Sequence, residues 1–108
     1  GRLREDAAYL DAVARERFEA IATRRAGVLA VQAPALAALP HPLAARVALI
    51  ALTAAGCDPR RISSRHIDAV VALGRGDPGA SLDLPGRIGA RRRGGLVEFR
   101  PCASPGKS

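Results

Sequence analysis

The spacing of apolar residues changes near residue 80, and this change restricts the fold more than any other feature. Up to about residue 75 apolar side chains recur at steps of three and four, the period of an amphipathic helix. Beyond residue 80 they alternate, with Leu82 and Leu84 between Ser81 and Asp83. Long helical segments followed by short alternating ones predict a mainly α fold of the α+β class. We expect a small domain of about four helices followed by a short antiparallel β-hairpin or meander.

Helix periodicity and end signals predict where these helices lie. Gly27 follows the first, Pro42 suits the first turn of the third, and Gly56 can stop it. Ser63 or Ser64 can cap the fourth by accepting a hydrogen bond from a free backbone N–H. The predicted helices are 2–25, 34–39, 42–55 and 64–74. The apolar piece at 28–32 stays unassigned, and 57–62 is predicted as a loop.

Turn residues separate the segments that follow the last helix. Pro85-Gly86 suits a type II turn, and Gly94-Gly95 suits a two-residue hairpin turn. Strands are predicted near 81–84, 87–93 and 96–100, and Val97 and Phe99 share one face of the last strand. Residues 1–100 are predicted to form a single domain, and residues 101–108 a flexible tail.

Positive charge is concentrated in the predicted hairpin. The 108-residue chain has a net charge of +7, and residues 81–108 contribute +4 of it, from five Arg and one Lys against two acids. A GC-rich genome explains part of the preference for Arg over Lys, but it explains the positive balance less well. The Arg guanidinium binds phosphate through two parallel hydrogen bonds. The candidate RNA-binding residues are Arg60, Arg61, Arg65, His66, Arg87, Arg91, Arg92 and Arg93.

The sequence contains no recognisable catalytic or metal-binding motif. It has no Gly-rich phosphate loop before a helix, no paired carboxylates in one motif and no Ser/His/Asp arrangement. His41, between two prolines, is interpreted as a turn residue, and a solvent-exposed or structural role is the alternative for His66. Cys57 and Cys102 have no partners at zinc spacing and are expected to be free thiols in the cytoplasm. No apolar run approaches the length of a membrane span.

The order of short motifs from Leu39 to Phe99 resembles the region after the catalytic domain in tRNA(Ile)-lysidine synthetases. The likeness covers roughly residues 1–100, and the first helix only loosely. The motifs that carry it are Leu39-Pro40, then Pro42-Leu43 and Arg46, then Ser63-Ser64-Arg65-His66-Ile67 with Val70 and Leu73, and finally Leu84-Pro85-Gly86 with Arg91-Arg92 and Gly95-Leu96.

This resemblance implies a role for the chain in tRNA modification. The family ligates lysine to the wobble cytidine of isoleucine tRNA, using ATP. ATP and lysine, with magnesium, are expected in an N-terminal catalytic domain whose Ser-Gly-Gly-x-Asp-Ser loop is absent from this sequence. The chain itself is expected to be non-catalytic and to position isoleucine tRNA, with that catalytic domain as its other partner and no membrane. Because it begins without Met inside a predicted helix, we expect a piece of a longer enzyme, either a short-form or a truncated member.

Two other functions fit the same elements. A helix, helix, hairpin order is also that of a winged-helix DNA-binding domain. The loop from Gly56 to Arg61 is, however, longer than the three or four residues usual in that turn. A structural interaction domain is the third hypothesis, and it predicts an exposed apolar patch rather than a basic one.

Overall fold

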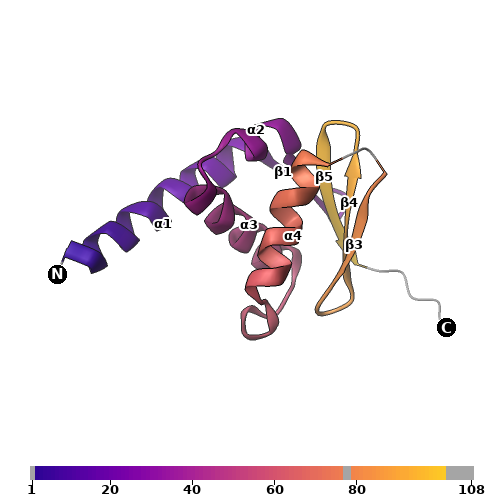
Figure 1. Cartoon of the computed structure of the whole chain (residues 1–108). Helices are drawn as coiled ribbons and strands as arrows, with labels where there is room; N and C mark the ends of the chain where they lie inside the picture. The colour runs from indigo at the N-terminus through magenta and orange to yellow at the C-terminus, as the bar shows by residue number, and fades with distance from the viewer. Residues whose placement is uncertain (1, 77–78, 102–108) are drawn as a thin grey trace.

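The helices of the domain lie on one face of a five-stranded antiparallel sheet (Figure 1). The computed structural model describes residues 2–76 and 79–101, and side chains from residue 8 onward. The predicted α+β class and the four helices are confirmed. The elements are α1 (Arg2–Ile21), β1 (Ala22–Arg25), β2 (Val28–Gln32), α2 (Ala33–Ala38), α3 (His41–Ala55), the 3-10 helix η1 (Pro59–Arg61), α4 (Ser64–Arg75), β3 (Ser81–Leu84), β4 (Ile88–Arg93) and β5 (Leu96–Pro101).

The prediction that the first helix reaches residue 25 is wrong. Helix α1 ends at Ile21, and Ala22–Arg25 forms strand β1, which pairs antiparallel with β2. Ala and Arg are good helix formers, so local preference favoured a longer helix. Pairing with β2 overrides this local helix preference, because residues 22–25 form backbone hydrogen bonds along the edge of that apolar strand. Ala26 and Gly27 make the connecting turn with φ of 52° and 80°.

The sheet is also larger than the predicted hairpin or meander. Its strand order is β1-β2-β5-β4-β3, so the early hairpin joins the C-terminal meander through β2 and β5. In that pairing Leu29 lies opposite Phe99, and Val31 lies opposite Val97. Pairing between strands so distant in sequence has no local signal. It holds the two halves of the chain together and places β5 at the centre of the sheet.

The remaining differences lie at the ends of elements. Helices α2, α3 and α4 differ from prediction by one residue at their ends, and His41, interpreted as a turn residue, is the first residue of α3. Arg87, predicted to begin a strand, lies instead in the turn with a φ of 60°, and β5 extends to Pro101. The predicted loop at 57–62 contains η1. Residues 102–108 of the predicted tail, with Cys102, lie outside the described residues.

The core fills the space between the helices and the inner face of the sheet. Its largest fully buried side chains are Phe99, Leu36, Leu52, Val31, Val47, Val70 and Val97. Buried Ala residues on α3, such as Ala44 and Ala48, let neighbouring backbones approach closely. Among the described residues no polar or charged side chain is buried. The charged groups of the described residues therefore lie at the surface, and a binding site that uses them has to lie there too.

Candidate nucleic-acid interface

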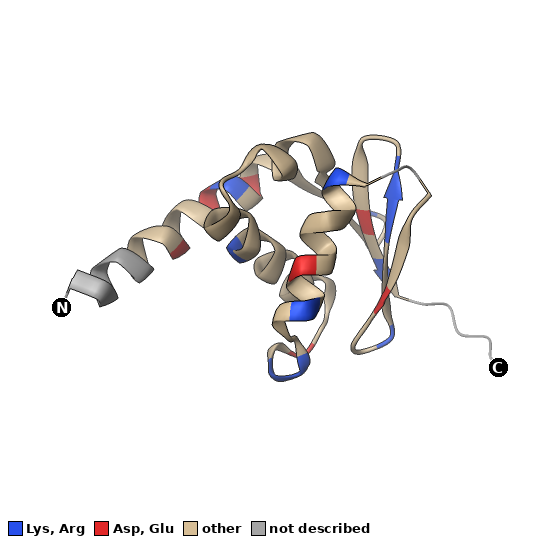
Figure 2. Ribbon diagram, in the orientation of Figure 1, with Lys and Arg blue, Asp and Glu red and all other residues tan. Residues whose placement is uncertain are grey.

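Two segments that carry arginines meet at one end of the molecule. They are the loop between α3 and α4 and the turn between β3 and β4. A Cβ atom on Gly86 would lie 3.5 Å from the Gly56 carbonyl oxygen and 3.9 Å from Cys57 Cα, so the turn packs on the start of the loop. In Figure 2 the ribbon is blue at basic positions of both the loop and the turn at this end. We call Arg60, Arg61, Arg65 and Arg87, all exposed, the basic end.

The loop at the basic end is held by a short-range cap. Asp58 Oδ1 accepts a hydrogen bond from the Arg60 backbone N–H at 3.0 Å, which fixes the first turn of η1. The Arg60 guanidinium also lies 3.4 Å from the same oxygen, but its side chain is 90% exposed, so this ion pair contributes little to stability. Arg61, Arg65 and Arg87 have no ion-pair partner in the described part of the chain. The backbone is thus ordered while the guanidinium groups face solvent.

His66 belongs to the cap of helix α4. Its Nδ1 accepts a hydrogen bond from the Ser63 backbone N–H at 3.0 Å, and its own backbone N–H donates to Ser63 Oγ at 3.4 Å. This reciprocal pair is a capping box in which histidine takes the position usual for Glu or Gln. Ser63, rather than Ser64, is therefore the cap. The arrangement gives His66 the structural role that was the alternative to RNA contact.

Arg92 points away from its two neighbours on β4. Its guanidinium donates hydrogen bonds to the carbonyl oxygens of Gly74 at 2.9 Å, Gly76 at 3.2 Å and Gly94 at 2.6 Å. Arg24 does the same for α3, donating to the Ala54 carbonyl oxygen at 2.7 Å. Carbonyl groups in the last turn of a helix have no partner within it, and cations there are favourable. Arg92 therefore helps to hold the C-terminal end of α4 against β4.

Arg91 and Arg93 lie on the opposite side of β4, where no helix packs (Figure 1). Strand residues alternate between faces, so Ile88, Ala90 and Arg92 face the helices while Arg91 and Arg93 face away. In the sequence, Arg91, Arg92 and Arg93 form one run of candidate RNA-binding residues. The two-residue alternation of buried and exposed positions in this strand is the signal that separates them.

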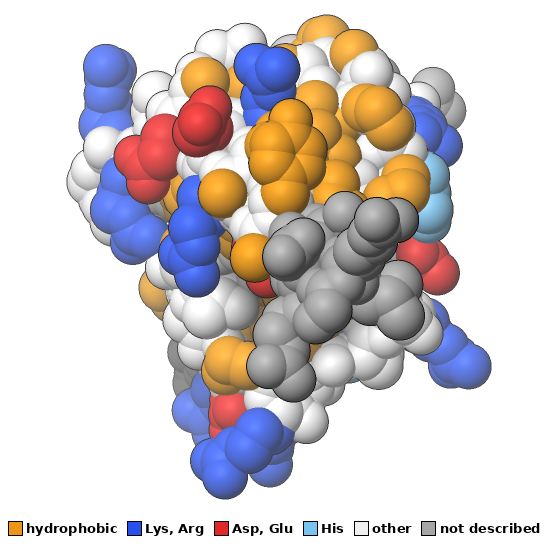
Figure 3. Space-filling model, turned by 90° about the vertical axis from the view of Figure 1, so that its left-hand side faces the viewer, with side chains coloured by type: hydrophobic (Ala, Val, Ile, Leu, Met, Phe, Trp, Pro, Cys, Tyr) orange, Lys and Arg blue, Asp and Glu red, His pale blue; other side chains and the backbone are white. Residues whose placement is uncertain are grey.

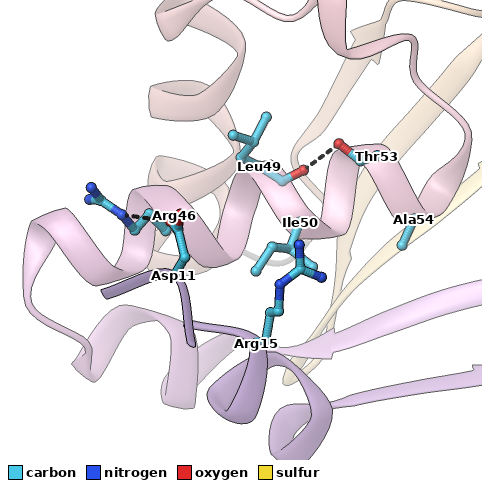
Figure 4. Close-up of a pocket in the computed structure, with 7 residues that line it drawn as sticks. All are labelled: Asp11, Arg15, Arg46, Leu49, Ile50, Thr53 and Ala54. Carbon is cyan, nitrogen blue, oxygen red and sulfur yellow. Dashed lines mark hydrogen bonds and ion pairs between the residues drawn. The ribbon is translucent and has the colours of Figure 1, made fainter. Parts of the chain in front are cut away.

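A shallow groove runs between α1 and α3 on the helical side. Arg46 pairs with Asp11 at 3.2 Å across it. Figure 4 shows Arg15 extending beside Ile50. Apolar side chains gather on this side of the molecule (Figure 3). Tyr9 is 69% exposed and Leu49 is 38% exposed. The apolar patch that an interaction domain predicts is therefore present, on a different side from the basic end.

Comparison with known families gives the decisive observation. Residues 32–97 match the family model described as the TilS substrate binding domain. The chain belongs to this family. The match confirms the resemblance to tRNA(Ile)-lysidine synthetases. No curated protein matches the chain.

The TilS substrate binding domain match contains the whole of α2, α3 and α4 and all eight predicted site residues. Arg25 and Arg100 lie outside it. The winged-helix hypothesis fits less well, because residues 56–63 between α3 and α4 exceed a turn of three or four residues. Within the described ranges, no helix combines the length and the apolar character needed to cross a membrane.

Proposed function

We propose that the chain is the non-catalytic part of a tRNA(Ile)-lysidine synthetase that binds isoleucine tRNA and positions it for modification. The match to a substrate binding domain supports this proposal most directly. In the whole enzyme, lysine is ligated to the wobble cytidine with ATP. This domain binds and orients the tRNA, so that the anticodon can reach a catalytic domain in the same protein.

The basic end supplies the groups that bind RNA phosphates in this proposal. Its exposed guanidinium groups sit on backbone that is fixed by the Asp58 cap and by the contact of Gly86 with Gly56. Arginines held in this way can contact phosphate oxygens without ordering a mobile loop first. Such contacts set the position and orientation of the RNA but read no bases. The proposed role therefore needs no base-specific pocket.

ATP, lysine and magnesium are proposed to bind the N-terminal catalytic domain and not this chain. The glycines of the described residues have structural roles in turns and in helix packing. Gly94 and Gly95 form the turn between β4 and β5. Gly74 packs closely on Leu36, since a Cβ atom placed on it would lie 3.2 Å from the Leu36 side chain. Neither forms a loop between a strand and a helix that could cradle a triphosphate.

A binding titration with isoleucine tRNA tests the proposal. Fluorescence anisotropy of labelled tRNA is measured at two salt concentrations, with this chain and with the intact synthetase. The double substitution R60A/R61A should weaken binding about tenfold and lower the slope of log affinity against log salt by about 2, one for each lost phosphate contact.

The matched control is R15A/R17A, which removes two exposed arginines from α1, away from the basic end. It changes net charge equally and should have a much smaller effect. Equal losses in the two variants would show only general attraction between a basic protein and RNA. Undiminished binding by R60A/R61A at both salt concentrations would contradict the proposed role of the basic end.

A further inference from the structure

We propose that the face of the sheet that no described helix or loop covers is a second RNA-binding surface, separate from the basic end, which takes a phosphodiester backbone. This inference rests on the proposed function and deepens it. We call the surface the open sheet face. Its basic residues are Arg25, Arg91, Arg93 and Arg100, on β1, β4 and β5.

Strand register shows that these arginines share one face. Arg91 lies opposite Glu98, and Glu98 lies opposite Ala30, so this row crosses the sheet from β4 to β2. Arg93 lies opposite Leu96 at the end of β4 nearest the Gly94-Gly95 turn. The buried residues Phe99 and Val97 alternate with Glu98 on β5 and therefore mark the other face.

The orientation of Arg25 and Arg100 follows from the next row of paired residues across the sheet. Arg100 lies opposite Gly89, and Arg25 lies opposite Val28. Val28 and Ala30 are two residues apart on β2 and share a face, while Leu29 between them pairs with the buried Phe99. Arg25 and Arg100 therefore point to the same side as Arg91 and Arg93.

The charge on this face is positive even after its acids are counted. Glu98 is paired with Arg100 at 3.0 Å, and its side chain is only 12% exposed. Arg25, Arg91 and Arg93 have no ion-pair partner among the residues that the structure describes. Among the described strand residues, Asp83 is the other acid on this side, at the β3 edge, opposite Gly89. An unpaired basic rim on an uncovered sheet fits a polyanion.

The shape of the face favours RNA over a compact anion. A shallow hollow crosses β1, β2 and β5, with Val28, Ala30 and Leu96 as its apolar floor and Arg25 and Arg100 among its lining residues. Apolar contact suits a ribose or a base, while guanidinium groups at the rim suit phosphates. Arg91 and Arg93, two residues apart on one strand, are about 7 Å apart at their Cα atoms, the scale of successive phosphates along a chain.

The open sheet face is distinct from the basic end. Arg87 occupies the turn at one end of β4, whereas Arg93 is the last residue at its other end. Arg100, opposite Gly89, lies nearer that turn, so the two surfaces are farthest apart at Arg93. One RNA that contacts both would be held at two places along its backbone, which fixes its orientation better than a single cluster.

Binding and footprinting with the 108-residue chain test the inference. R91A/R93A should weaken binding of an isoleucine tRNA transcript about tenfold and lower the salt slope by about 2. Arg25 lies on β1, far in sequence from β4, and R25A should also weaken binding of the transcript. Circular dichroism and urea unfolding check that each variant remains folded, and R15A/R17A is again the control for net charge.

Hydroxyl-radical footprints separate the two surfaces. R91A/R93A should lose protection at one set of nucleotides and R60A/R61A at another. If R91A/R93A binds as tightly as the unsubstituted chain while R60A/R61A is weakened, the open sheet face does not bind RNA, and the proposed function stands. If R91A/R93A loses affinity for a tRNA and an unrelated RNA hairpin equally, and the chain shows no preference for the tRNA, the face binds RNA and the proposed substrate is wrong.

Discussion

Arg92 and Gly74 lie 18 positions apart in sequence, and an Arg92 guanidinium nitrogen donates to the Gly74 carbonyl oxygen at 2.9 Å. This bond ties strand β4 to the C-terminal turn of α4. A second bond from the same nitrogen reaches the Gly76 carbonyl oxygen at 3.2 Å. The Arg92 side chain therefore caps the C-terminal end of α4, the helix whose N-terminal turn carries Arg65 and His66.

Removing the Arg92 side chain should destabilise the fold without removing an RNA contact. Because hydrogen bonds to charged groups contribute more than neutral ones, we expect R92A to lower the free energy of unfolding by about 2 kcal/mol. R92K keeps the charge but lacks the planar fork, so it should recover only part of the loss. Urea unfolding followed by circular dichroism measures both.

The neighbouring Arg93 supplies the control. Its side chain is exposed and faces away from the helices, so R93A should change the unfolding free energy by less than about 0.5 kcal/mol. A stable R92A variant with an RNA affinity as low as that of R93A would show that Arg92 belongs to the interface instead.

The cap of helix α4 allows a comparison of two adjacent serines. Ser63 Oγ accepts a hydrogen bond from the backbone N–H of His66, whereas Ser64 is the exposed first residue of the helix. S63A should therefore cost about 1 kcal/mol of stability. S64A should be nearly neutral. Thermal unfolding of the two variants gives the test, and equal melting temperatures would contradict the assignment of the cap.

Local signals predicted much of this fold. Helices α3 and α4 combine a clear apolar period with Pro42 or Ser63 at the start and a glycine at the end, so their bounds came within one residue. Strand β1 was missed because Ala22–Arg25 has helix-forming residues and becomes a strand only by pairing with β2. The β2–β5 pairing depends on a contact between distant segments, for which no short-range pattern exists.

The candidate site divides in the same way. Arg60, Arg61 and Arg65 could be predicted as candidates because they cluster in sequence. Arg92 was grouped with its neighbours because only the α4 carbonyl groups, distant in sequence, distinguish it. Arg25 and Arg100, which we propose as part of the open sheet face, carry no such signal, because β1 is predicted as helix and the face they share exists only once β2 and β5 pair.

The Gly86 turn should be sensitive to any side chain. Its φ of +81° lies in the left-handed region, which costs an L-residue about 1–2 kcal/mol. A Cβ there would also contact the Gly56 carbonyl oxygen at 3.5 Å. G86A should lower stability by about that amount and shift Arg87 relative to Arg60, which weakens RNA binding as well.

Gly95 offers the matched glycine for that experiment. It has no positive φ, and a Cβ built on it would meet nothing within 4 Å. G95A should therefore unfold at nearly the same urea concentration as the unsubstituted chain. If G86A does so too, the turn does not require glycine.

The Cys57 thiol should react slowly in the folded domain. Cys57 is a free cysteine, 3% exposed, and burial raises the pKa of its thiol above the usual value. Since the thiolate is the nucleophile, both low access and the raised pKa slow alkylation at neutral pH. The C102S variant leaves Cys57 as the single thiol. Its labelling by iodoacetamide at pH 7.5 should be far slower in buffer than in urea.

The same raised pKa fixes the sign of a pH effect. The folded state keeps the Cys57 proton to a higher pH than the unfolded chain, so the folded state binds more protons once the unfolded thiol begins to ionise. The stability that Cys57 confers is thus complete below the unfolded pKa and declines as pH rises through the folded one. In a C102S background, C57A should remove this alkaline decline in urea unfolding. Rapid labelling of folded C102S protein, or an alkaline decline that persists in C57A, would show that Cys57 is not held as a buried neutral thiol.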